Sequence, residues 1–470
     1  MMDFIVLFPL IVVGAGAIIL MLMASMKSLG EGNTALAALG IFALAFAVQL
    51  MVSATESVTP YGGIFNGMLV ANGFTKVAGL IIIASGFVSC LTAQSYFTQN
   101  KFYSAEFYSL IMFAACGMLL LTMSAELITL FISLEIMSLA IYVLVGYDRT
   151  NIKRSEAVLK YLMLGAFAGA FFTMGTAFVY AAVNSTRFVD IAGHLSTTSF
   201  LESPAMAAGA FLVIVAFLFK VAAFPFHAWV VDVYDGAPLP VTGFMATAVK
   251  TAVFAVFANF LIIDDGLKGV WVEYLFYIAV LTMFAGNLIA IGQNSLKRML
   301  AASGIVHTGY LLVALVAVGT ENFTGGVILY YLAAYAVATL GVFAALSYLG
   351  GENERRDTFE HFKGLAKVRP YSAAAITIFM LSMAGIPPTA GFMGKFYIIA
   401  DAIRAGYMLL AVLAIVSSVL SMWYYLRLVV MMYFKEPEEE FETTGMSLAP
   451  IGTALLAVCV FAIGFYPVLL

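Results

Sequence analysis

Five ionisable side chains interrupt stretches of the sequence that are otherwise apolar. They are Glu135, Lys220, Lys250, His307 and Lys395. A charge at the centre of a lipid bilayer costs about 2.5–3.5 kcal/mol on insertion scales, so such groups face the interior of a helix bundle and mark paths for ions or substrates. Lys220 follows a long apolar run and Lys250 lies midway through its own, so neither ammonium group is expected to reach a membrane surface.

These residue types favour proton transfer over a substrate pocket. A lysine removed from water binds its proton less tightly and a nearby carboxylate restores that affinity, so a Glu–Lys pair whose separation changes can load and release protons. Glu135 and Lys220 are the candidate pair. Taken alone, His307 would be interpreted as a hydrogen-bonded core residue, and its place among buried lysines makes it a candidate.

Two other charged residues have simpler interpretations. Lys160 lies near the start of an apolar stretch, so its long side chain is expected to extend to the membrane surface. Glu126 lies at the boundary between two apolar stretches and is expected to be exposed, with its role left open.

Prolines accompany two of the lysines. Pro225 follows Lys220, while Pro387 and Pro388 precede Lys395. Proline removes a backbone donor and opens the preceding helical turn, and freed backbone groups are tolerated in a membrane only inside protein or against water. A broken helix beside a buried lysine would suit a hydrated half-channel. A plain packing kink is the alternative.

The composition shows what kind of scaffold carries these residues. The 470 residues are 63% hydrophobic and 10% charged, whereas a soluble domain is roughly half apolar and a quarter charged. The apolar residues come in runs of about 20, which indicates membrane-spanning helices and excludes barrel strands. The opening segment is interpreted as a first spanning helix. The cysteines, Cys90, Cys116 and Cys459, lack the spacing of a metal site or a disulfide framework.

The hydropathy predicts an all-α polytopic membrane protein in a single membrane domain, 1–470, with about 14 transmembrane helices. The seventh and twelfth spans, which hold the prolines, are five apart and so cross the membrane in opposite directions, as an inverted repeat requires. The predicted division is an N-terminal part, two five-helix repeats and a last helix: 1–105, 106–262, 270–431 and 444–468. The stretch DVYDGAPLP is predicted to be the turn between the seventh and eighth spans.

Lysine and arginine concentrate in alternate loops, which predicts a cytoplasmic side for those loops and an outer side for both termini. The cytoplasmic set is Lys27, Lys101, Arg149, Lys153, Arg154, Lys297, Arg298, Arg355, Arg356, Lys363, Lys367, Arg369 and Lys435. Two longer loops, 350–370 and 434–445, are expected to be solvated faces. No ATP, flavin or nicotinamide fingerprint is visible, so energy for ion movement must come from a gradient or from partner subunits.

Several runs resemble the N subunit of the proton-pumping NADH:quinone oxidoreductase, respiratory complex I, over roughly residues 105–430. These runs are FPFHAWVVDVYDGAPLPVTGFMATAVKTAVF, LFISLEIMSLAIYVLVGYDRTNIKRSEAVLKYLM, NSLKRMLAASGIVHTGYLL and LSMAGIPPTAGFMGKFYII. The resemblance implies two inverted five-helix repeats, broken helices at spans 7 and 12, and a proton path through the five residues named first. It adds Lys160, in SEAVLKY, to that path, and Glu126 departs from the smaller polar residue expected there.

The resemblance also implies partners. Flavin, Fe–S clusters and quinone would be held by other subunits, with no cofactor or metal in this chain, and M, K, J and L type subunits would be its membrane neighbours, beside lipids. The location would be the inner membrane of a bacterium, and nothing indicates a nucleic-acid partner. FPFHAW and GIPPTAGF are shared across the antiporter-like superfamily, so a subunit of a cation/proton antiporter or membrane-bound hydrogenase is the alternative. A purely structural subunit would place its charges at span ends, which Lys220 and Lys250 contradict.

Overall fold

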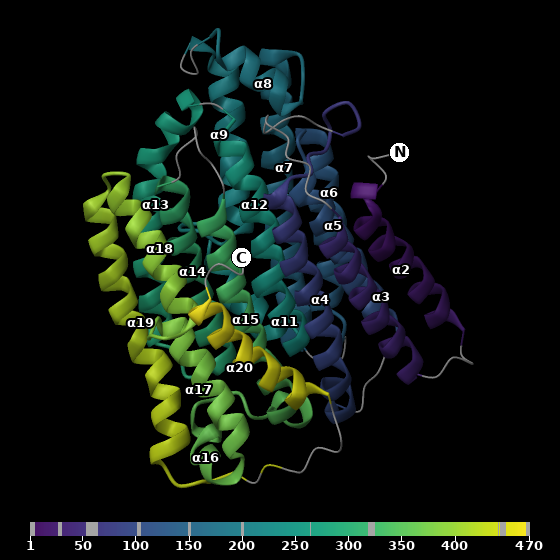
Figure 1. The fold of residues 1–470 in the computed structure, drawn as a ribbon, viewed down its shortest axis with the longest axis vertical. Coiled ribbons are helices and arrows are strands. Elements are labelled where there is room, and N and C mark those ends of the chain that lie inside the picture. The colour runs from purple at the N-terminus through teal and green to yellow at the C-terminus, as the bar shows by residue number, and fades with distance from the viewer. Residues whose placement is uncertain are drawn as a thin grey trace.

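The computed structural model is a bundle of helices (Figure 1). It describes residues 5–26, 31–52, 64–100, 105–148, 152–198, 202–263, 265–317, 325–439, 441 and 448–466. The helices of the N-terminal part and the first repeat are α2 (Phe8–Ser25), α3 (Glu31–Met51), α4 (Gly73–Asn100), α5 (Glu106–Met123), α6 (Leu127–Val145), α7 (Ile152–Val183), α8 (Phe188–Leu195), α9 (Pro204–Lys220), α10 (Ala228–Gly236), α11 (Leu239–Phe244), the π-helix η2 (Met245–Val249) and α12 (Lys250–Leu261). The remainder are α13 (Asp265–Ile291), α14 (Leu296–Ala317), α15 (Gly326–Leu349), the 3₁₀ turns η3 (Glu352–Glu354) and η4 (Glu360–Phe362), α16 (Leu365–Val368), α17 (Pro370–Ala384), α18 (Ala390–Arg404), α19 (Met408–Phe434) and α20 (Ala449–Phe465).

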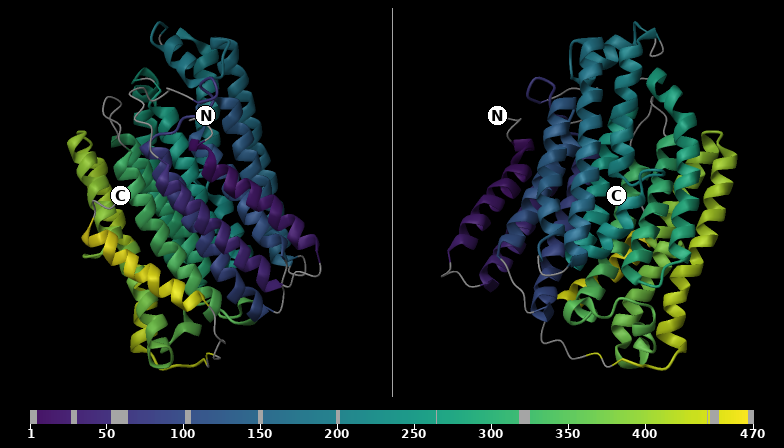
Figure 2. Two further views of the ribbon diagram at one scale, coloured as in Figure 1. Left: turned by 45° about the vertical axis from the view of Figure 1, so that its right-hand side comes forward. Right: turned by 180° about the vertical axis from the view of Figure 1, so that it is seen from behind.

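The long helices lie side by side, with α2 and α3 at one edge of the bundle and α19 at the other (Figures 1 and 2). The short helices α8 and α16 lie at opposite ends, and α20 slants across the outside. In the described part of the chain, 11 helices are long and apolar enough to span a membrane. Three shorter apolar helices, Pro204–Lys220, Pro370–Ala384 and Ala449–Phe465, fall in the predicted spans 7, 12 and 14. The predicted all-α membrane fold is confirmed, and the number of crossings stays a prediction.

The centre of the bundle is formed by the segment Leu239–Leu261, by α14 and by α15. The most apolar windows of the first two are wholly buried, whereas only 28% of the corresponding windows of α2, α3 and α7 is buried. The outer helices therefore expose apolar side chains, as expected of surfaces that face lipid. Two of these central elements carry Lys250 and His307, so these two groups are remote from the outer surface.

Both predicted broken helices are confirmed. In the first, α9 ends at Lys220 and α10 begins at Ala228, with Pro225 in the irregular stretch between them. In the second, α17 ends at Ala384 and α18 begins at Ala390. The stretch between these two helices contains both Pro387 and Pro388.

Backbone groups released by the first break are satisfied by two threonines of neighbouring helices. The Thr308 hydroxyl of α14 donates to Val221 O at 2.8 Å, and the Thr282 hydroxyl of α13 accepts from Phe224 N at 3.0 Å. At the second break, the Ser382 hydroxyl accepts from Gly391 N at 3.1 Å. Such internal partners are what allows irregular backbone within a membrane.

The two halves of the bundle repeat one order of elements. Residues 106–261 contain three long helices, a broken helix and a further helix, and residues 265–434 contain the same series. This order agrees with two five-helix repeats, whose boundaries at 106–262 and 270–431 stay a prediction.

The side of the membrane on which each loop lies also stays a prediction. Several residues on which that prediction depends lie outside the described residues, namely Lys27, Lys101, Arg149, the Lys153 side chain and both chain ends.

The prediction that DVYDGAPLP is a turn was wrong for most of its length. Asp232 to Gly236 form the end of α10, and α11 begins at Leu239, so the turn is confined to Ala237 and Pro238. The polar Asp232 and Asp235 made this stretch look like a loop. Both carboxylates instead pair with Arg298 of α14, at 3.0 and 3.6 Å, which allows the helix to continue.

The two longer loops, which were expected to be solvated faces, carry exposed side chains such as Glu436, but they also contact each other. Three cations of the first loop pair with acidic residues of the second: Lys367 with Glu436, Lys363 with Glu438, and Arg356 with Glu439. Hydrogen bonds to Glu360 and Glu438 raise the pKa of Lys363. Arg356 is itself buried, as are Phe359 and Phe362 of the first loop. Net attraction between opposite charges brings the loops together over an apolar base.

Two glycines set the distance between α7 and α9, and therefore the position of Lys220. A Cβ atom added at Gly175 would lie 2.8 Å from Gly209 O, and one added at Gly209 would lie 2.8 Å from Gly175 O. Only glycine permits this approach of the two backbones, a common arrangement in membrane helix pairs.

Gly209→Ala is expected to separate α7 from α9 and to lower the unfolding free energy by about 1–3 kcal/mol, the usual cost of overpacking. Gly40→Ala in α3 is the control, because nothing lies within 4 Å of a Cβ atom there. Thermal denaturation of the detergent-purified protein measures both variants. Equal midpoints for the two would show that the close approach is not needed.

Candidate functional site

Lys220 is the last residue of α9 and is 7% exposed. Its ammonium group donates to the Ser138 hydroxyl of α6 at 2.8 Å. Glu135 lies one helical turn before Ser138 and is half-buried. Its carboxylate lies beside Gly169 of α7, where an added Cβ atom would be 3.3 Å from Oε1. Glu135 acts on Lys220 electrostatically without a direct ion pair, so the pairing of these two groups stays a prediction.

Lys220 and Lys250 line one small cavity. Its volume is about 10 Å³, and its walls include the side chains of Tyr161, Trp229 and Tyr234. This is about the space that one water molecule needs. The indole N–H of Trp229 has no partner among the described residues. The first two lysines of the predicted path therefore share one small space, although they lie in different helices.

Lys250 follows the π-helix η2 and is the first residue of α12. A π-helical turn is rare and often marks a functional site. The Lys250 ammonium donates to Gly304 O of α14 and lies 5.2 Å from the centre of the Tyr335 ring. A side chain at position 304 would crowd this contact, because an added Cβ atom would be 3.2 Å from Lys250 Nζ.

His307 lies one turn beyond Gly304 in α14 and is 4% exposed. Its Nδ1 atom is 2.6 Å from the Tyr331 hydroxyl, and its Nε2 atom is 3.1 Å from the Tyr425 hydroxyl. In a neutral imidazole one nitrogen donates and the other accepts. A proton that arrives at one nitrogen can therefore leave from the other, which is the chemistry expected of a relay.

Lys395 projects from α18 and is 5% exposed. Its ammonium donates to Met383 O at 2.9 Å, Ala384 O at 3.1 Å and the Ser418 hydroxyl at 3.0 Å. The two carbonyls end α17, and the last carbonyls of a helix have no partner within the helix and carry partial negative charge. Lys395 thus stabilises the end of α17 at the break.

The two broken helices place their lysines alike. Lys220 precedes its break in the sequence and Lys395 follows its own, yet both mark the C-terminal end of a first half-helix. Lys220 is the last residue of α9, and the Lys395 ammonium donates to the last carbonyl of α17. The sequence alone made the two repeats look mismatched at this point.

A group of buried tyrosines around His307 was missed by sequence reasoning. Its members are Tyr310, Tyr331, Tyr335, Tyr424 and Tyr425. The Tyr310 ring lies 5.0 Å from Lys395 Nζ, and the Tyr424 hydroxyl donates to Asn287 at 3.1 Å. Their spacing was an available signal, because His307 with Tyr310 and Tyr331 with Tyr335 are three and four residues apart on helices.

Lys160 does not join the buried group. Its side chain is 40% exposed, as expected for a lysine near a span end, and it pairs with Glu156 and Asp232 at 2.7 Å each. Asp232 lies in α10, the helix whose Trp229 and Tyr234 line the cavity at Lys220. Lys160 is therefore linked to the wall of that cavity from outside.

The expectation that Glu126 is exposed was wrong, because it is 9% exposed. Its carboxylate accepts from the hydroxyls of Thr186 at 2.7 Å and Thr129 at 3.1 Å. A segment boundary in the sequence did not correspond to the protein surface, because the chain around residue 186 covers the start of α6.

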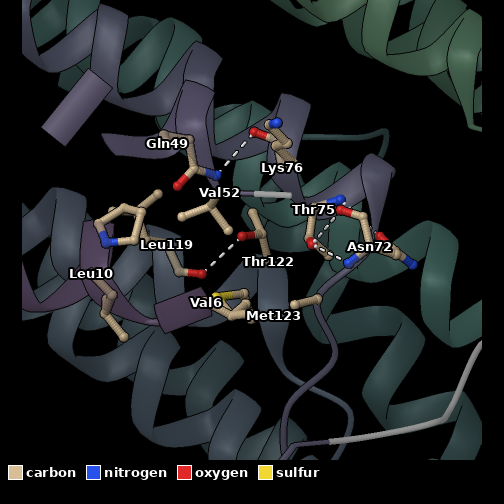
Figure 3. A pocket seen from close by; sticks show the side chains of 12 residues that line it. Val6, Leu10, Gln49, Val52, Asn72, Thr75, Lys76, Leu119, Thr122 and Met123 are labelled. Atoms are coloured by element: carbon tan, nitrogen blue, oxygen red, sulfur yellow. Dashed lines mark hydrogen bonds between the residues drawn. The ribbon is translucent and has the colours of Figure 1, made fainter. Parts of the chain in front are cut away.

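A cavity of about 30 Å³ lies elsewhere, between α2, α3, α4 and α5 (Figure 3). Gln49, Asn72, Thr75 and Lys76 form its polar wall, and none of the five ionisable residues of the predicted path borders it. Within the described ranges, no group of three His, Cys, Asp or Glu side chains could hold a metal ion.

Replacing Glu126 by leucine is expected to lower the unfolding free energy by about 1–3 kcal/mol, because two threonine hydroxyls lose their acceptor in a buried site. Glu126→Gln retains an acceptor oxygen of the same reach and serves as the control. Thermal denaturation of the purified protein compares the two. A leucine variant as stable as the glutamine variant would contradict this role for the carboxylate.

Known proteins were compared with the chain. The family described as "NADH:quinone oxidoreductase/Mrp antiporter, TM" matches residues 124–421. The NADH-quinone oxidoreductase subunit N of Trichlorobacter lovleyi is 40% identical over 83% of this chain and 80% of its own length. The subunit N of Bdellovibrio bacteriovorus is 38% identical over 90% of this chain and 89% of its own length.

Solved structures agree. A chain in the structure of respiratory complex I from Thermus thermophilus is 32% identical, with a TM-score of 0.83 and 98% of both chains covered. A chain of the Mrp complex from Dietzia is 19% identical, with a TM-score of 0.76, covering 100% of this chain and 94% of its own. At that identity the likeness shows the fold alone. The chain belongs to the family of NADH-quinone oxidoreductase N subunits, within the group of complex I and Mrp antiporter membrane subunits.

Proposed function

We propose that the chain translocates protons across the membrane as the N subunit of an NADH-quinone oxidoreductase. The observation that carries the proposal is the series of buried ionisable groups through the centre of the bundle. Lys220 and Lys250 share a cavity. Lys250 contacts Gly304, one turn from His307.

The link from His307 to Lys395 is aromatic and polar. The Tyr310 ring lies beside both groups. Its centroid is 6.2 Å from the centroid of the His307 ring and 5.0 Å from Lys395 Nζ. A second cavity of about 10 Å³ is bordered by His307, Tyr331, Tyr335 and Met383, whose carbonyl accepts from Lys395. Tyrosine hydroxyls and small cavities supply hydrogen-bond steps between the charged groups.

Glu135 and Lys220 would form one end of this series, and Lys395 the other. Glu135 is half-buried next to exposed apolar residues of α6, including Ile132 and Ile136, which places it near the outer surface of the bundle. Lys160 and Asp232 would supply protons to the same end from outside the cavity. Movement of charge at one lysine would alter the proton affinity of the next.

The energy would come from other subunits. The relatives are named as subunits of NADH-quinone oxidoreductase, so electron transfer from NADH to quinone would take place at flavin and Fe–S centres held by partner subunits. Membrane subunits of the M, K, J and L types would be its neighbours. The location would be a bacterial cytoplasmic membrane with both termini on the periplasmic side, as the lysine and arginine distribution predicts.

The alternative is a subunit of a cation/proton antiporter that couples Na⁺. Of the five groups in the proposed path, the four that are buried are basic nitrogen groups, namely Lys220, Lys250, His307 and Lys395. Hard cations such as Ca²⁺ and Mg²⁺ are bound by clusters of oxygen ligands, which ammonium groups do not supply, and Na⁺ makes the same demand. The chemistry therefore favours protons.

Lys220→Ala and Glu135→Ala are each expected to lower proton uptake per NADH oxidised to less than about a tenth, because removal of a positioned acid–base group interrupts transfer at that step. Inverted membrane vesicles that contain the assembled complex provide the measurement, with NADH oxidation and a pH-sensitive dye followed together. Lys367→Ala is the control, since Lys367 is an exposed lysine paired with Glu436.

Assembly is expected to persist in both variants. Native gel electrophoresis measures this, and the complex should run at its normal size. A normal ratio of protons to electrons in either variant would contradict the proposed path. A similarly low proton uptake per NADH oxidised in the Lys367 variant would indicate a nonspecific effect of removing a lysine.

A further inference from the structure

Thr308 lies between the two halves of the proposed path. It follows His307 in α14 and is fully buried. Its hydroxyl oxygen is 2.8 Å from Val221 O and 3.2 Å from Gly304 O. Val221 follows Lys220 at the first break, and Gly304 O accepts from the Lys250 ammonium. One hydroxyl therefore contacts both the carbonyl of the residue after Lys220 and the carbonyl that accepts from Lys250.

The hydroxyl cannot satisfy both carbonyls at once, because a threonine side chain has a single donor proton. Gly304 O is also restricted. As part of α14 it accepts the helical hydrogen bond from the amide of residue 308, four residues later. A carbonyl oxygen has two lone pairs. The remaining one is available either to the Lys250 ammonium or to the Thr308 hydroxyl.

We propose that Thr308 is a positioning residue that links the state of Lys250 to the break beside Lys220. While Lys250 donates to Gly304 O, the hydroxyl donates to Val221 O. This is the arrangement in the structure, where the distance to Val221 O is the shorter of the two. When Lys250 loses its proton, its neutral amine is a weaker donor than the ammonium, so the hydroxyl displaces it at Gly304 O and releases Val221 O.

The released carbonyl would matter because Val221 borders the cavity that Lys220 and Lys250 share. A free acceptor there would offer a new hydrogen bond to a water molecule or to the Lys220 ammonium. Loss of the proton from Lys250 would thereby make the neighbourhood of Lys220 more favourable to a positive charge. This inference rests on the proposed proton path and adds a coupling between two of its steps.

The first break supplies a matched control. Thr282 also supports its backbone, since its hydroxyl accepts from Phe224 N at 3.0 Å and donates to Ile278 O at 2.6 Å. Neither of these contacts involves Gly304 or Lys250. Thr282→Val and Thr308→Val therefore remove the same chemical group and each disturb the same break, but only the second removes the link to Lys250.

The experiment measures proton uptake per NADH oxidised in vesicles that contain the assembled complex. Thr308→Val is expected to lower this ratio about fivefold, because one hydrogen bond of typical strength shifts a two-state equilibrium by about that factor. Thr308→Ser retains the donor and is expected to stay within about twofold of the unmodified complex, as is Thr282→Val. If the valine variant does not assemble, Thr308→Ala removes the same hydroxyl with a smaller side chain.

Equal losses in the Thr308 and Thr282 variants, or failure of serine to restore the ratio, would overturn the inference and leave only a structural role. Lys250→Met separates this failure from failure of the path. A methionine variant that pumps normally would refute the proposed function itself. A methionine variant that does not pump, together with a normal Thr308→Val ratio, would refute only the coupling.

Discussion

An ammonium group buried among apolar helices needs acceptors from the protein, and this requirement shapes the centre of the bundle. Lys395 uses the last carbonyls of α17, which the break releases. Lys250 uses a carbonyl that the bare backbone of Gly304 leaves accessible. Lys220 uses the Ser138 hydroxyl. Broken helices, a glycine and a serine thus offset the cost of burying charge.

The helix α14 connects these sites. Gly304, His307 and Thr308 occupy little more than one turn, yet they contact α12, the tyrosine group and the first break. At its start, Lys297 donates to Ala237 O, at the end of α10, and to Glu354, each at 2.7 Å. The helix α14 therefore holds both ends of the segment from Val221, at the first break, to Ala237, in the turn before α11. A rigid element with contacts at several points can couple distant groups when each contact has two arrangements.

Outside this centre, the structure serves mainly to hold α14 and the broken helices in place. Tyr96, Arg154 and Lys297 meet around the carboxylate of Glu354, a buried cluster that joins α4, α7, α14 and the loop after α15. Buried ion pairs add little net stability, but they define which groups must meet. Close glycine contacts between α7 and α9 serve the same purpose through shape.

The sequence by itself determined the membrane class, the burial of Lys220, Lys250 and Lys395, and the two broken helices. These features follow from hydropathy and from the missing N–H of proline, which act within a few residues. Tertiary structure decided the partners: the tyrosines around His307, the burial of Glu126, and the equivalent placement of Lys220 and Lys395 at the ends of half-helices. These depend on how each helix is rotated against segments far away in the chain, which local patterns do not encode.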